Sequence, residues 1–197
     1  LAGLRERYAG RLYHHGLPPR DQHLLQSIGV TECRAFDLDK IKSDKFARVS
    51  RLAFSRYECF ALLSQYRQVL WLDADVLITG DLRPMLRHDT RDIAMHPHTG
   101  VEMRNSFTAD IAGYDMQRTL YNDGIMLLND NLPDPQALCD WCYDATNEHA
   151  DAISSDQAVI NMLLQRFHLH VHDLPQRYNC PPRRALWPTR HRRTRHF

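Results

Sequence analysis

The apolar residues of this chain fall into short runs and helical steps that polar turns separate. Residues 69–72 are apolar at every position and too few for a helix, which predicts a strand buried on both faces in a parallel sheet covered by helices. Across residues 49–64, apolar side chains recur at steps of three and four, which predicts a helix with one buried stripe. This alternation of strands and helices is typical of an α/β fold.

Shorter elements are expected on either side of these two. Residues 11–14 read as a strand, residues 22–28 as a helix that Gly29 ends, and residues 33–38 as a second strand. No linker or repeat divides the chain, so a single domain is expected.

Two later helices carry start signals. Asp134 followed by Pro135 fits an N-cap and a first helical residue. Ser154, with Gln157 three residues later, matches a capping box ahead of an apolar helix.

Composition narrows the class of protein. The 197 residues are 43% hydrophobic, which is enough for one domain with a real core, and the net charge of +1 indicates no nucleic-acid partner. No apolar run approaches the ~20 residues of a membrane span. Arginines crowd the C-terminal end, where they can contact phosphates or an anionic membrane surface, although a solvated tail is the simpler interpretation. They are Arg183, Arg184, Arg190, Arg192, Arg193 and Arg195.

The five cysteines are odd in number and widely scattered, which predicts reduced thiols. Cys139 and Cys142 form a C-x-x-C pattern inside the helix expected after Pro135. Because no second pair exists to complete a zinc site, zinc or redox chemistry there is disfavoured.

Asp73 and Asp75 follow the apolar strand directly. If the extended conformation continues, both carboxylates point the same way and can reach one divalent cation. A solvated turn at the strand end is the alternative. The preceding strand and the apolar residues that follow favour the metal site.

Four segments together carry a family resemblance: Arg56 with Tyr57, then residues 66–82, 121–129 and 156–161. Their order and spacing resemble the retaining glycosyltransferases of family 8, and the similarity runs from about residue 49 to residue 179. The resemblance implies a GT-A fold, which is a Rossmann-like mixed sheet flanked by helices, spread over residues 1–197 as a single domain. The family's first strand and its closing C-terminal segment are not found, so the domain is expected to be incomplete at both ends.

The same resemblance implies roles for individual residues. Asp73, Asp75 and His196 would be ligands of Mn2+ or Mg2+. Asp156 and Gln157 would lie at the reaction centre as the catalytic residues.

The resemblance also implies a group of substrate-binding residues at the donor, namely Arg56, Ala74, Asn122 and Asp123. Arg56 would contact the donor diphosphate, or else form a structural salt bridge. Asp123 departs from the small residue common in the family, and its carboxylate would lie near the sugar. Without the other motifs, residues 122–124 would be an ordinary turn signal.

The activity that follows is metal-dependent transfer of a hexose from a UDP-sugar to a glycan or lipopolysaccharide-type acceptor, with retention. A cytoplasmic enzyme is expected, with peripheral contact at the inner membrane face through the basic tail. Two alternatives stay open: a non-catalytic GT-A-like binding or scaffold module, and, less favoured, a metal-dependent phosphohydrolase.

Overall fold

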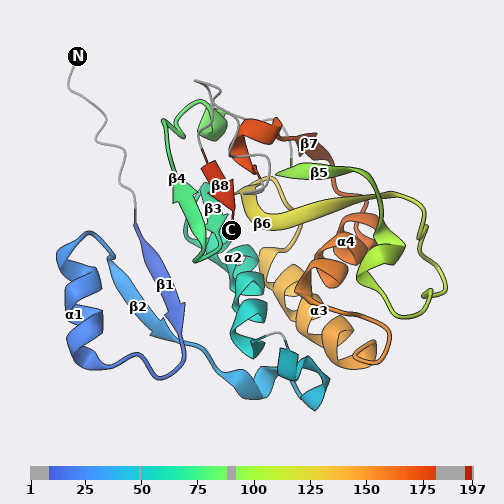
Figure 1. The fold of residues 1–197 in the computed structure, drawn as a ribbon, viewed down its shortest axis with the longest axis horizontal. Helices are drawn as coiled ribbons and strands as arrows, with labels where there is room; N and C mark the ends of the chain where they lie inside the picture. The colour runs from blue at the N-terminus through green and yellow to red at the C-terminus, as the bar shows by residue number, and fades with distance from the viewer. Residues whose placement is uncertain (1–8, 49, 88–91, 181–193, 197) are drawn as a thin grey trace.

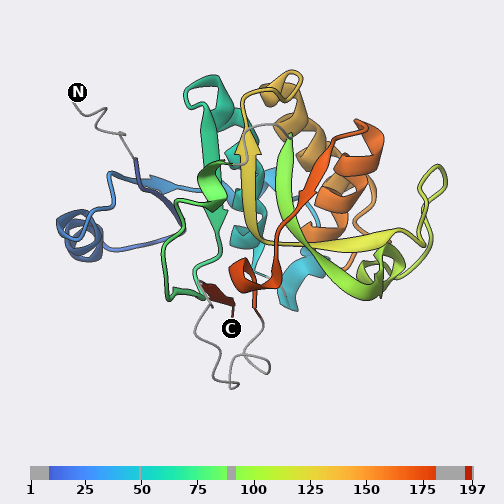
Figure 2. The ribbon, with the colours of Figure 1, turned by 90° about the horizontal axis from the view of Figure 1, so that it is seen from above.

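The computed structural model describes residues 9–48, 50–87, 92–180 and 194–196. A small lobe of two strands and one helix lies beside a larger body, in which helices cover one face of the main sheet (Figures 1 and 2). In chain order the elements are β1 Arg11–His14, α1 Pro19–Ser27, β2 Glu32–Ala35, η1 Leu38–Lys40, η2 Asp44–Arg48, η3 Arg51–Tyr57, α2 Glu58–Ala61, η4 Leu62–Ser64, β3 Gln68–Leu72, β4 Val76–Ile78, η5 Met85–Arg87, β5 Ile93–Glu102, η6 Met103–Ser106, β6 Thr119–Asn129, α3 Pro135–Glu148, α4 Asp156–Arg166, β7 Val171–Asp173, η7 Gln176–Tyr178 and β8 Thr194–His196.

The main sheet has the order β3-β6-β5-β7. β6 runs antiparallel to both of its neighbours, and only β5 and β7 pair in parallel. The sheet is therefore mixed. The prediction that residues 69–72 lie in a parallel sheet is wrong, because β3 pairs with β6 in the antiparallel sense.

β3 also differs from the expected fully buried strand. All five of its residues are half-buried, although the run from Val69 is entirely apolar. The physical reason is its position: within the described residues β3 has a partner on one edge only, and β1 and β2 form a separate parallel pair. Its other side borders a pocket.

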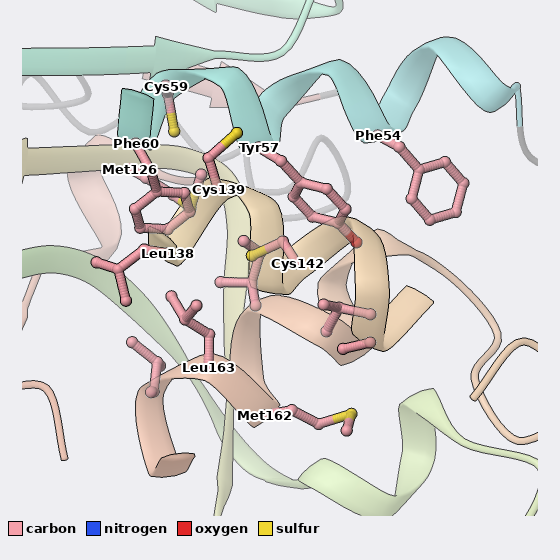
Figure 3. Packing of buried hydrophobic residues seen from close by; sticks show 14 of the residues in the cluster. Phe54, Tyr57, Cys59, Phe60, Met126, Leu138, Cys139, Cys142, Met162 and Leu163 are labelled. Atoms are coloured by element: carbon pink, nitrogen blue, oxygen red, sulfur yellow. The ribbon is translucent and has the colours of Figure 1, made fainter. Parts of the chain in front are cut away.

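Two apolar clusters lie on opposite faces of the main sheet, because side chains alternate along each strand. In β6, Met126 and Leu128 enter the larger cluster, while Ile125 and Leu127 enter the smaller one. Figure 3 shows the larger cluster, where η3 and α2 pack across α3 and α4 through aromatic rings and sulfur atoms. This packing fixes the helices against the sheet.

The helical segment predicted for residues 49–64 is present, but mostly as 3-10 turns (η3 and η4) around the short α2. Ser50 begins it by accepting a hydrogen bond from the Leu52 amide at 3.2 Å. Residue 49 itself lies outside the described part. The buried stripe is confirmed in part: Arg56, Phe60 and Leu63 are buried, whereas Leu52 and Ala53 are half-buried.

The smaller elements follow the sequence with shifted boundaries. The strand at residues 11–14 is confirmed, α1 begins earlier than predicted because Pro19 occupies its first turn, and β2 ends at Ala35 rather than at residue 38. Asp134 caps α3 by accepting a hydrogen bond from the Ala137 amide at 3.2 Å, as predicted.

The capping box at α4 is wrong. Ser155 is the N-cap and makes no side-chain capping bond. The Ser154 hydroxyl instead donates to the Ser106 carbonyl at 2.8 Å, so a tertiary contact has replaced the local one.

None of the described helices is long and apolar enough to cross a bilayer. Of the six C-terminal arginines, only Arg195 lies within the described residues, on β8.

Phe60 gives a direct test of the larger cluster, because its side chain is fully buried. Phe60→Ala should lower the free energy of unfolding by about 3–5 kcal/mol, through lost apolar burial and an unfilled cavity. Urea titration measures this. The matched control is Leu24→Ala on α1, where the side chain is 62% exposed and the change should stay within about 0.5 kcal/mol. Equal losses at both positions would contradict this account of the core.

Candidate active site

The chain turns sharply where β3 ends. The Asp73 amide donates to the Gly124 carbonyl at 2.9 Å, which extends the pairing with β6 by one residue, and the Val76 amide then donates back to the Asp73 carbonyl at 3.1 Å. The extended conformation therefore does not continue to Asp75, because Ala74 and Asp75 form a turn. Asp73 is left half-buried and Asp75 exposed.

This turn forms part of the wall of a pocket of about 560 Å³ between the small lobe and the main body. β1 contributes Leu12 and Tyr13, and η3 contributes Arg56. The strand end contributes Trp71 and then Asp73, Ala74 and Asp75. Four of the predicted site residues thus line one cavity.

Arg56 joins three carboxylates from three different elements. Its Nη2 donates to Asp73 at the end of β3, at 3.0 and 3.3 Å to the two oxygens. Its Nη1 lies 2.6 Å from an oxygen of Asp123 on β6. Its Nε pairs with Asp156, the first residue of α4. The guanidinium therefore holds the strand end, the middle of β6 and the start of α4 together.

The electrostatics of this cluster follow from its burial. Arg56, Asp123 and Asp156 are each about 5% exposed or less. Burial alone would lower the pKa of Arg56, but the three carboxylates outweigh burial and raise it, so the guanidinium stays charged. Burial raises the pKa of Asp123 to about 7, against the opposing effect of Arg56. Burial likewise raises the pKa of Asp156, which Arg56 also opposes.

Trp71 contacts both Asp73 and Arg56. Its indole N–H donates to Asp73 Oδ1 at 2.7 Å, and its ring lies 5.7 Å from the Arg56 guanidinium carbon. The Asp73 carboxylate is thus oriented from two sides before any ligand binds.

An irregularity in β6 places Asp123. The register with β5 shifts so that Met126 is opposite Met95 while Asn122 is opposite His96. Residues 123–125 are therefore extra relative to β5, as in a β-bulge, and bulges re-aim side chains beside functional sites. Residues 122–124 lie inside a strand, so their interpretation as an ordinary turn is wrong.

Several amide side chains border the ion cluster, which is the group formed by Arg56, Asp73, Asp123 and Asp156. Asn122 donates to Gln157 Oε1 at 3.4 Å and accepts from the Gly124 amide at 3.1 Å and from the Asn179 side chain. Asn161 on α4 bonds both the amide and the carbonyl of Tyr121, at 2.8 and 2.9 Å. These bonds fasten β6 to α4 beside the bulge.

Three further residues make contacts at the candidate site without having been predicted as site residues: Trp71, Asn161 and Asn179. Asn161 carried the clearest signal, because it is a polar residue inside the apolar face of a helix, and such a buried amide needs partners. Trp71 and Asn179 gave no local signal, since their contacts depend on the tertiary fold.

His196 lies on β8, where it pairs through the backbone with Val76, the residue after Asp75. This pairing brings the third predicted metal ligand to the same end of β3. Within the described residues no three side chains already form a metal cluster. Two aspartates at the rim of a pocket still fit a hard divalent cation, because carboxylate oxygens are the ligands that Mg2+ and Mn2+ prefer.

The C-x-x-C cysteines lie on α3, away from this pocket, and both are buried free thiols. Burial raises the pKa of Cys139 to about 12 and that of Cys142 well above its usual value, which disfavours the thiolate form of both.

Comparison with known proteins shows which family the chain belongs to. The sequence model described as Glycosyl transferase family 8 matches residues 20–194, which is most of the chain. The chain belongs to glycosyl transferase family 8. The predicted resemblance is therefore confirmed, and glycosyl transfer is the chemistry of the family.

Two curated relatives of this family 8 chain come from Streptococcus pneumoniae serotype 4. Glycosyltransferase GlyE is 25% identical over 124 residues, which are 62% of this chain and 27% of GlyE. Glycosyltransferase GlyB is 26% identical over 115 residues, which are 58% of this chain and 26% of GlyB. The chain thus spans about a quarter of the length of these relatives.

Solved structures establish the fold. The galactosyltransferase LgtC, in complex with donor and acceptor sugar analogs, superposes with a TM-score of 0.70 at 14% identity, over 98% of this chain and 77% of LgtC. Mouse xyloside xylosyltransferase 1 in its apo form gives a TM-score of 0.54 at 13% identity, over 95% and 82% of the two chains. The predicted GT-A fold is confirmed.

The raised pKa of Asp123 predicts how stability depends on pH in metal-free buffer. The folded pKa of about 7 exceeds the unfolded value of about 3.9, so the folded state binds the proton more tightly, and stability is lost as pH rises through the folded pKa. Asn cannot titrate. The stability of the wild type relative to Asp123→Asn should therefore fall between pH 5 and 7, by up to about 1.4 kcal/mol per pH unit, and then level off above pH 8. Urea titrations across this range measure the difference, and a difference independent of pH would refute the assignment.

Proposed function

We propose that this chain transfers a hexose from a UDP-sugar to a glycan or lipopolysaccharide-type acceptor, with retention at the anomeric carbon and with Mn2+ or Mg2+ as cofactor. The observation that carries the proposal is the position of Asp73 and Asp75 at the carboxyl end of β3, in the wall of the 560 Å³ pocket. Ligands of open α/β sheets gather at this end of the strands, and small-molecule sites commonly measure about 300–1,000 Å³.

The pocket offers different chemistry on different walls. Leu12, Tyr13 and Trp71 give it apolar and aromatic surface suited to a nucleoside. Asp73 and Asp75 give it oxygen ligands for the cation that accompanies a diphosphate, with His196 as the third ligand. When bound, the cation supplies neutralisation of the charge that builds on the departing diphosphate.

The residues around the ion cluster would serve the sugar. Asn122 and Gln157 present amides that can bond sugar hydroxyls, and Asp156 orients the start of α4 toward the same region through Arg56. Arg56 itself is buried and its nitrogens already face carboxylates, which favours the structural salt bridge over direct binding of the diphosphate.

The same proposal places the enzyme in the cytoplasm, with the arginines of residues 183–195 contacting the inner membrane face. Vesicle flotation tests this part separately. Binding to anionic but not to neutral vesicles is the expected result, and absence of binding to either would refute the membrane contact.

The central experiment titrates the purified chain with UDP-glucose and UDP-galactose, with and without Mn2+, and follows binding and release of UDP. Metal-dependent binding with turnover supports the transferase. Metal-dependent binding without turnover, in the presence of candidate acceptors, would favour a binding module. Release of phosphate from simple esters would favour a phosphohydrolase.

Asp75→Asn tests the metal site within this proposal. The change keeps the size of the side chain but removes one anionic ligand, so Mn2+-dependent donor binding should weaken at least tenfold, or about 1.4 kcal/mol. Because Asp75 is exposed, stability in metal-free buffer should change by less than about 0.5 kcal/mol.

Calorimetry and thermal melts measure the two quantities. The exposed Asp144→Asn on α3 makes the same change of charge outside the pocket, and it should alter neither. If Asp75→Asn unfolds the protein, Asp75 is structural and the assignment is wrong.

A further inference from the structure

Asp123 lies in the irregular part of β6. Its carboxylate is 4% exposed and faces Arg56, and its Oδ2 makes no hydrogen bond with the described residues. The resemblance predicts that Asp123 binds the donor sugar, but its carboxylate is buried against Arg56 and is not among the residues that line the 560 Å³ pocket.

The distances within the ion cluster indicate a role for Asp123. Arg56 Nη1 lies 2.6 Å from Asp123, whereas Nη2 lies 3.0 and 3.3 Å from the two oxygens of Asp73. Nε is in close contact with Asp156. Asp73 receives hydrogen bonds from Arg56 at both of its oxygens, whereas the contacts with Asp123 and Asp156 are ion pairs without hydrogen-bond geometry. The three carboxylates therefore compete for one guanidinium.

This competition affects metal binding, because the Asp73 carboxylate cannot bind the Arg56 guanidinium and a divalent metal ion equally well at the same time. A carboxylate engaged by a guanidinium through both oxygens has less capacity left for a metal ion. Three carboxylates that share one guanidinium also leave an excess of negative charge when ionised, and such an excess attracts a divalent cation.

We propose that Asp123 is a positioning residue, which competes with Asp73 for the Arg56 guanidinium and so limits how strongly Arg56 engages Asp73 when a divalent cation binds. The inference rests on the proposed metal site. It assigns to Asp123 an effect on cation affinity that is exerted through Arg56, without contact between Asp123 and the metal.

The primary test measures Mn2+ binding to the full chain, with Mn2+ alone as the probe and with free Mn2+ followed by electron paramagnetic resonance. Asp123→Asn removes the charge while keeping the shape, so Arg56 should engage Asp73 more fully and the Mn2+ Kd should rise about tenfold. Asp144→Asn is the matched control and should leave the Kd unchanged. Melting curves establish that each variant is folded.

A second measurement reports on the guanidinium itself and does not involve metal. In protein carrying 15N-labelled arginine, the Nη signals of Arg56 should shift or broaden in metal-free Asp123→Asn, because one of the three contacts that fix the group is weakened. A residue that only filled space would leave these signals in place when replaced by its isostere. Asp123→Ala serves for both measurements if the Asn variant does not fold.

The outcomes separate this inference from the function on which it rests. A wild type that binds no Mn2+ refutes the proposed metal site. A wild type that binds Mn2+, with an Asp123→Asn Kd within twofold of it, overturns the role of Asp123 and leaves the metal site standing. A weaker Kd with unchanged Arg56 signals also overturns it, because Asp123 would then act only through its electric field.

Discussion

The structure depends on one buried cation. Arg56 faces Asp73, Asp123 and Asp156, and these three belong to elements that are far apart in the sequence. Removing one partner of a buried ion pair typically costs about 3–5 kcal/mol, because the remaining charge is left uncompensated in a poorly hydrated place. The ion cluster therefore ties the geometry of the candidate active site to the stability of the fold.

The rest of the fold can be understood as support for that cluster. The 3-10 segment η3 carries Arg56 between Phe54 and Tyr57, whose rings are buried in the core. The bulge in β6 turns Asp123 toward the guanidinium, and the side chain of Asn161 fastens β6 to α4 beside it. At the start of α4, the helix dipole favours the negative charge of Asp156. A site supported in this way is oriented before any ligand arrives.

The sequence predicted the elements that local signals control and missed those that tertiary contacts decide. The apolar run before Asp73 located β3, and Asp134 with Pro135 located the start of α3. The antiparallel pairing of β3 with β6 was not predictable from the apolar run, because such a run does not encode the direction of its neighbour. Only the family resemblance predicted a mixed sheet. The capping box failed because Ser154 has a tertiary partner. At the candidate site, the family resemblance singled out Arg56, Asp73 and Asp156, and the structure brings these side chains together. The contact of Asp123 with Arg56 depends on a bulge that no local pattern indicates.

The most direct test of the central claim is a crystal structure of the chain with Mn2+ and UDP, with the metal located by its anomalous signal. We expect an anomalous peak bound by Asp73 and Asp75, UDP in the pocket between β1 and β3, and Arg56 still bridging Asp123 and Asp156. A peak elsewhere, or UDP bound outside this pocket, would contradict the central claim.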